Sequence, residues 1–257
     1  MSDTVEGIVG ELLIVLLVAA IAIGVHYLVQ RRIDYQRFSR HNDVAGFLLS
    51  VIGVMYAVVL GFVVVVVWER YTATQGYVQD ETAAVSNVYR IAAAFPPPQR
   101  NAIRSTLRAY VSEVIRDEWP SMQRGDAQGA SSMLERVAYE VDVFRPNNSG
   151  EADAHQIAMA QLQNLFDARR HRFAQVKPSV PAILWFALIS GGLVTLGFCY
   201  FFGTENRGAQ LLMTGALAGI IAVLFIVIVE FDAPFRGSVA VQAGGWTNLA
   251  HRLPSIR

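Results

Sequence analysis

The sequence predicts an all-α, polytopic membrane protein with four transmembrane helices and a helical extramembrane domain between the second and third. Of its 257 residues, 53% are hydrophobic and only 16% are charged, which is more apolar than a typical soluble domain. Four apolar segments are each long enough to cross ~30 Å of hydrocarbon at about 1.5 Å per residue. The intervening polar stretch repeats its apolar residues at spacings of three and four, and it contains no hairpin signal.

The predicted spans are Ile8–Val29, Val44–Trp68, Val180–Phe202 and Ala209–Phe231. The chain therefore divides into a first pair of membrane helices (1–68), the extramembrane domain (69–179), a second pair (180–231) and a tail (232–257). We expect the first span to be retained, because "MSDTVEG" before it has acidic residues and no Lys or Arg, unlike a secretory signal.

Proline-containing segments delimit the helices of the extramembrane domain. The helix that continues the second span should end at "FPPPQ" (95–99), because consecutive prolines cannot extend a helix. The next two helices are expected to end at "EWP" (118–120) and "RPNNSG" (145–150). A last helix, roughly 151–176, leads to the third span.

Basic residues gather in the loop between the first two spans. This loop contains Arg31, Arg32, Arg37 and Arg40, and the positive-inside rule favours placing it in the cytoplasm. With four spans, the extramembrane domain and both termini share the opposite side, where basic residues also lie close to the membrane. The orientation stays open.

Enzymatic chemistry has no candidate constellation in this sequence. The five histidines form no H-x-x-x-H or HExxH pair, and phosphate-loop, G-x-S-x-G and C-x-x-C motifs are missing. Scattered histidines in helices are expected at surfaces or interfaces. The formal net charge of zero argues against nucleic acid as a partner, and nothing indicates a cofactor.

Small residues line one face of several spans. On the second span they are Gly46, Ser50, Gly53, Ala57 and Gly61, and the fourth contains Gly215-x-x-x-Gly219. Such faces let helix backbones approach closely in lipid. They could serve packing within one chain or assembly of several copies.

A second stripe on the second span is bulky and almost wholly apolar. It consists of Leu49, Ile52, Tyr56, Leu60, Val63 and Val67. In a ring of subunits this stripe could form a narrow neck that gates by dewetting, and simple contact with lipid is the alternative.

The fourth span ends on two carboxylates, in the stretch "IVIVEFDAPFRGS" (226–238). Glu230 falls in the last helical turn, where the helix dipole disfavours an anion unless a cation or backbone amides lie nearby. Pro234, Phe235 and Gly237 follow in a predicted tight turn. An interfacial anchor is one interpretation; a cation site at Glu230 and Asp232 is another, although two carboxylates are few ligands for calcium.

Four stretches resemble a bacterial family of membrane proteins usually described as bestrophin-like, itself distantly similar to the bestrophin anion channels. They are "HNDVAGFLLSVIGVMYAVVLGFVVVVVWERY" (41–71), "DEWPSM" (117–122), "PAILWFALISGG" (181–192) and "FDAPFRGSVAV" (231–241). "DAPFRG" looks like a loose form of the motif after the bestrophins' fourth span. The acidic run that follows it in bestrophins is missing, which puts calcium gating in doubt.

The resemblance implies a homo-oligomeric, anion-conducting channel of the bacterial inner membrane, with a pentamer favoured. The second spans would ring the axis, and the neck would be Tyr56, Leu60, Val63 and Val67 or the residues one step around the helix. The loop arginines would attract small inorganic anions to one mouth. A non-conducting scaffold or sensor whose helical domain docks a partner is the alternative.

Overall fold

The computed structural model describes residues 2–32, 42–126, 132–202 and 206–253. Its α-helices are α1 (Ser2–Arg32), α3 (Asn42–Ile91), α4 (Pro97–Glu113), α5 (Trp119–Gln123), α6 (Ser132–Asp142), α7 (Ser149–Ala174), α8 (Ala182–Tyr200), α9 (Arg207–Asp232) and α10 (Gly244–Arg252). A 3₁₀ turn (Ala92–Ala94) follows α3, and a π-helix (Val114–Glu118) joins α4 to α5. The described part of the chain contains no strand, so the all-α prediction is confirmed.

The chain forms two compact units. Unit 1 comprises residues 1–69, 179–232 and 237–239, and unit 2 comprises residues 70–178, 233–236 and 240–257. Four helices are long and apolar enough to cross a membrane: α1, α3, α8 and α9. Helix α3 contributes its first half to unit 1 and its second half to unit 2.

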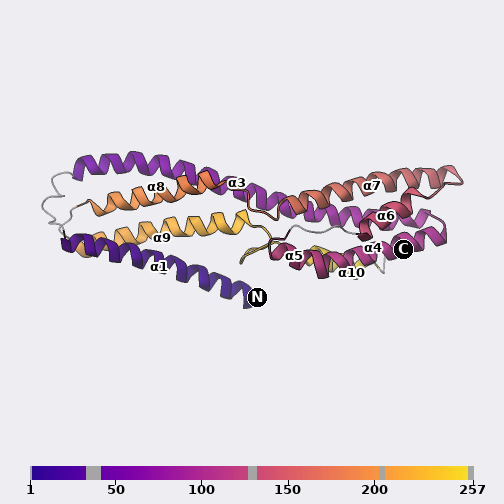
Figure 1. Ribbon diagram of the computed structural model, residues 1–257, viewed down its shortest axis with the longest axis horizontal. Helices are drawn as coiled ribbons and strands as arrows, with labels where there is room; N and C mark the ends of the chain where they lie inside the picture. Colours follow the sequence, from indigo (N-terminus) through magenta and orange to yellow (C-terminus); the bar gives the residue numbers. More distant parts are fainter. Residues whose placement is uncertain (1, 33–41, 127–131, 203–205, 254–257) are drawn as a thin grey trace. The chain divides into compact units, whose positions relative to one another are not determined.

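Glycines bring the helices of unit 1 together. Helix α1 lies along α9 (Figure 1), where a Cβ added at Gly215 would fall 2.6 Å from Ile23 Cδ1. Tyr56 of α3 lies against α8 in the same way, since a Cβ at Gly191 would be 2.5 Å from Tyr56 Cδ2. These small residues of α8 and α9 therefore serve packing within the chain.

The small stripe of α3 is different. A Cβ added at Gly53 or Gly61 would meet nothing within 4 Å, and Ala57 is exposed. In a single copy of the chain, this face of α3 is not used for close helix packing. It stays available to a neighbouring molecule in the membrane.

Unit 2 is a helical domain with one apolar core. Its largest fully buried side chains include Tyr110, Met122 and Trp246, which come from three different helices. Residues of the predicted tail (232–257) contribute to this core, since Trp246, Leu249 and Leu253 are buried in it.

The helix that begins at Pro97 does not end at "EWP", as the proline had suggested. Pro120 lacks an N–H, and its ring would crowd the carbonyl four residues earlier in a regular helix. The chain widens into a π turn just before it, in which the Trp119 N–H bonds the Val114 carbonyl, and it then continues as α5. The wider turn also leaves Glu118 buried.

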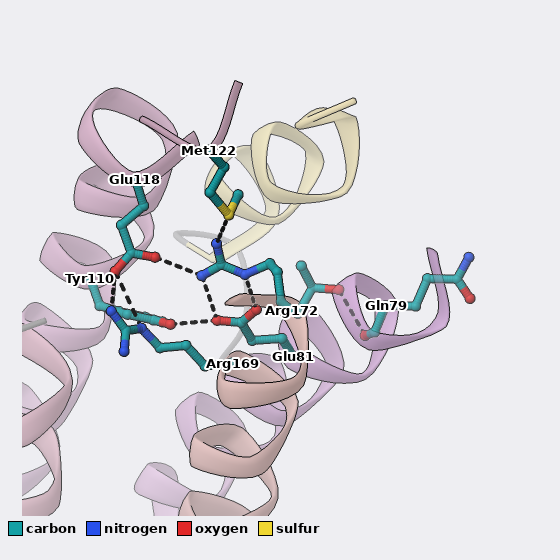
Figure 2. A network of polar contacts seen from close by, with 8 residues as sticks. Gln79, Glu81, Tyr110, Glu118, Met122, Arg169 and Arg172 are labelled. Carbon is teal, nitrogen blue, oxygen red and sulfur yellow. Dashed lines mark hydrogen bonds and ion pairs between the residues drawn. The ribbon is translucent and has the colours of Figure 1, made fainter. Parts of the chain in front are cut away.

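A buried ionic network holds the helices of unit 2 (Figure 2). The Arg172 guanidinium lies between two carboxylates, with its Nε 2.5 Å from Glu81 Oε2 and its Nη2 2.6 Å from Glu118 Oε2. Tyr110 donates a 2.6 Å hydrogen bond to Glu81, and Arg169 donates one of 2.6 Å to Glu118. The network joins α3, α4, the π turn and α7.

These contacts change the acidity of the groups involved. Burial raises the pKa of Tyr110 well above its usual value, and the neighbouring Glu81 charge raises it further. For Arg172, burial favours the neutral form, but Glu81 and Glu118 outweigh burial and keep its pKa above the ordinary value. The arginine is therefore a permanent cation inside a core, and it requires both carboxylates.

Candidate functional site

The face of α3 that we predicted as a neck lies largely inside its own subunit. Tyr56, Leu60, Val63 and Val67 are all at most 9% exposed and pack with residues of α8 and α9, such as Leu188 and Ile228. Leu49 and Ile52 are half-buried. A side chain covered by its own subunit cannot also line a passage between subunits, so these four residues serve intrachain packing.

The opposite face of α3 is exposed and apolar. Its side chains include Val54, Val58, Phe62 and Val65, which are between 52% and 69% exposed. No charged residue occurs on the helix between Val44 and Trp68. These residues lie on the side of the helix opposite the predicted neck stripe, and we call them the outward face of α3.

The predicted arginine mouth is described only in part. Arg31 and Arg32 are exposed at the end of α1, and the Arg31 guanidinium lies 4.6 Å from the centre of the Tyr27 ring. Arg37 and Arg40 lie outside the described residues.

Asp232 at the end of α9 binds the segment that leads into α8. Its Oδ1 accepts hydrogen bonds from Ser179 N (2.7 Å), Ser179 Oγ (2.9 Å) and Val180 N (3.2 Å). The carboxylate is only 3% exposed. The buried Asp232 carboxylate therefore anchors the segment before α8 to the end of α9 through charge-assisted hydrogen bonds.

Glu230 holds a different segment. Its Oε2 accepts hydrogen bonds from Ser238 N (2.7 Å) and Val239 N (3.3 Å), and Ser238 Oγ also contacts Glu11 of α1. These amides relieve the unfavourable position of the carboxylate at a helix C-terminus. Among the described residues, no group of three or more potential metal ligands occurs.

The remaining predicted turn residues have structural contacts. Phe235 is buried in unit 2, edge-on to Trp119 with ring centres 5.5 Å apart, and the Pro234 carbonyl accepts a 2.8 Å hydrogen bond from Val241. Gly237 has φ +85°, and a Cβ there would lie 2.3 Å from a Glu230 carboxylate oxygen. The predicted tight turn thus requires glycine at position 237.

We expect Gly237→Ala to destabilise unit 1. A non-glycine residue at positive φ costs about 1–2 kcal/mol, and the new methyl would also displace the Glu230 carboxylate from the amides it binds. Thermal unfolding of the full-length protein in detergent should show a midpoint several degrees lower. Gly197→Ala is the matched control, since a Cβ there meets nothing within 4 Å; equal midpoints for both variants would contradict this account.

One polar cluster was missed by the sequence analysis. His26 is fully buried in unit 1, contrary to our expectation that the histidines lie at surfaces or interfaces, and it contacts Gln30 and Thr214. The signal was present, since His26 and Gln30 are four residues apart on α1, as are Gln210 and Thr214 on α9. Polar side chains at that spacing on two spans indicate facing partners.

Comparison with known proteins identifies the family. The model of the Bestrophin-like domain matches residues 16–245. A bestrophin homologue from Klebsiella pneumoniae has a similar structure, with a TM-score of 0.67 and 15% identity over 97% of this chain and 98% of that one. A variant of that homologue has a TM-score of 0.68 at 14% identity, covering 96% and 98% of the two chains.

No curated protein matches the chain in sequence. The structural similarity supports the fold, and the family model covers most of the chain with the four spans and the helical unit between them. The chain therefore belongs to the Bestrophin-like family.

Proposed function

We propose that the protein is a homo-oligomeric ion channel of the membrane in which the outward face of α3 lines the ion path. The observation that carries this proposal is the division of α3 into three faces. One face packs inside the subunit, one carries the small residues Gly53 and Gly61 with no intrachain neighbour, and one is bulky and apolar. A helix that only contacts lipid on its free side needs no small stripe.

The three faces suit a ring of subunits. Small residues at Gly53, Ala57 and Gly61 would let α3 approach a neighbouring copy, because close packing drives helix association in lipid. The adjacent bulky face, with Val54, Val58 and Val65, would then point to the axis. A narrow ring of valines repels water and forms a constriction that gates by dewetting.

The exposed arginines at the end of α1 support conduction of anions. Arg31 and Arg32, repeated in every subunit, would raise the local concentration of small anions at one mouth. The permeant species we propose are chloride-sized inorganic anions. Liposomes containing the purified protein should pass chloride; no flux, or strict preference for cations, would overturn the proposal.

We predict that Val58→Thr increases the chloride flux. Threonine matches valine in shape but presents a hydroxyl, which would lower a dewetting barrier. Lowering that barrier by about 1.4 kcal/mol would raise the flux tenfold. The control is Val9→Thr on α1, where the side chain is 50% exposed. Equal fluxes in the two variants would exclude Val58 from the constriction.

The alternative is a non-conducting scaffold or sensor, and one feature of unit 2 favours it. A groove of about 440 Å³ lies between α3 and α7, and its lining includes the polar residues Asp80, Asn87 and Asn164. Such a groove could bind a partner protein. The oligomer mass in mild detergent separates the two functions, because a channel ringed by α3 requires a cyclic assembly, whereas a monomer or dimer favours the scaffold.

A further inference from the structure

A chain of polar side chains lies in unit 1 where α1 ends and α9 begins. His26 Nδ1 is 2.8 Å from Thr214 Oγ1, and His26 Nε2 is 3.2 Å from Gln30 Nε2. Gln30 Nε2 also donates a 2.9 Å hydrogen bond to Gln210 Oε1. The chain ends where Gln210 Nε2 donates to the carbonyl of Phe202, just beyond α8.

The direction of these hydrogen bonds fixes the form of the imidazole. The Gln30 amide nitrogen can only donate, so His26 Nε2 must accept. A neutral imidazole with an accepting Nε2 carries its proton on Nδ1, which therefore donates to Thr214 Oγ1. His26 is fully buried, and Thr214 and Gln210 are each at most 5% exposed.

A second proton on His26 is incompatible with this arrangement. Nε2 would then carry a hydrogen and need an acceptor, which only the Gln30 oxygen can supply after the amide reverses. The reversed Gln30 would face Gln210 with its oxygen, so Gln210 must reverse as well. The Gln210 oxygen would then oppose the Phe202 carbonyl, and the bond between α9 and the end of α8 is lost.

We propose that these residues form a proton-operated switch in which protonation of His26 reverses the Gln30 and Gln210 amides and releases the end of α8 from α9. An imidazole is the one side chain that can turn its accepting nitrogen into a donor near neutral pH. A purely structural link between α1 and α9 could use neutral side chains throughout. The switch does not require that the protein conduct ions.

No carboxylate among the described residues stabilises a protonated His26, so the imidazolium depends on the reversed Gln30 amide for an acceptor. In the described part of the chain, His26 forms no ion pair with a carboxylate. The Tyr200 ring of α8 lies edge-on, 5.1 Å from the imidazole centre. The other titratable or charged groups nearby in sequence are Cys199 on α8, Arg207 at the start of α9, and Tyr27, Arg31 and Arg32 on α1.

The lone cysteine, Cys199, lies three residues before Phe202 and reports on the end of α8. The test measures its labelling rate by 4,4′-dithiodipyridine in the full-length protein in detergent, at pH 8 and pH 5. His26→Gln is compared at each pH, because the ratio of the two rates cancels the pH dependence of the thiol itself. At pH 8, we expect the labelling rates of wild type and His26→Gln to agree within about twofold. At pH 5, wild type should be labelled about fivefold faster or more, because only wild type can protonate position 26.

Further variants make the outcome specific. Gln210→Leu removes the last link, so labelling should be fast relative to wild type at pH 8 even if His26→Gln fails to fold. His171→Gln, in unit 2, is the control. The ratio of its labelling rate to that of His26→Gln should equal the wild-type ratio at each pH. A ratio that stays the same at both pH values, or ¹⁵N signals of histidine that show no Nδ1-protonated neutral ring at pH 8, would overturn the switch.

Discussion

Arg172→Met should destabilise unit 2 strongly, by several kcal/mol of unfolding free energy. Removing the guanidinium leaves Glu81 and Glu118 as buried carboxylates without the cation between them. Breaking a buried ion pair by deleting one partner costs about 3–5 kcal/mol. Urea unfolding of the full-length protein, followed by tryptophan fluorescence, should show the loss, since Trp119 and Trp246 both lie in this core.

The matched control is Arg170→Met, two residues away on the same helix. Arg170 pairs with Asp167, but their side chains are 74% and 55% exposed, and an exposed pair contributes less than about 1 kcal/mol. Adding Glu81→Gln to Arg172→Met should recover part of the stability, because Glu81 then carries no unpaired charge, whereas Glu118 keeps its ion pair with Arg169. If Arg172→Met were as stable as Arg170→Met, the network would not be what holds these helices.

Asp232→Ala should have the second largest effect, and it acts on unit 1. The substitution removes the charged acceptor of the Ser179 and Val180 amides, and a hydrogen bond to a charged group contributes about 1.5–3 kcal/mol. The segment before α8 would then lose its attachment to the end of α9. We expect a loss of about 2–4 kcal/mol in unfolding free energy, together with faster proteolysis around residue 179.

Asp232→Asn separates this anchoring role from a role in cation binding. Asparagine retains an oxygen that can accept from both amides, so the anchored variant should keep most of its stability. A cation site would lose its charge and hence its affinity in either variant. If Asn and Ala were equally destabilising, with stability restored by added calcium, Asp232 would be a ligand and the anchoring account would be wrong.

The fold class could be predicted from the sequence because the four spans depend on local properties, namely length and apolarity. The helix after "FPPPQ" shows the limit of such reasoning. Pro120 was expected to end it, yet a π turn accommodates the proline while Trp119 and Met122 are buried in the core. The burial gained by continuing outweighs the helix-breaking preference of one residue.

The neck residues were harder to predict because periodicity gives a helix faces without showing what covers each one. Tyr56 was assigned to the axis, but Gly191 and Gly192 of α8 provide the space in which its ring packs. That pairing depends on the tertiary arrangement of two spans far apart in the sequence. On the small stripe of α3, by contrast, Gly53 and Gly61 have no intrachain neighbour within 4 Å of an added Cβ.

The buried ionic network did leave a signal in the sequence. Glu81 is in register with Val78 and Val85, Glu118 follows Val114 by four residues, and Arg172 follows Leu165 by seven. Each charged residue therefore occupies an apolar position of its own helix. Charges in core register on three helices indicate a buried ion pair, although their pairing becomes visible only in the structure.

A density map of the purified assembly tests the central claim most directly. We predict a cyclic oligomer with α3 as the innermost helix and a continuous passage narrowed by Val54, Val58 and Val65. Tyr56 and Leu60 should point away from the axis, toward α8 and α9. A map in which the outward face of α3 contacts lipid at the perimeter, with no opening through the particle, would contradict the account.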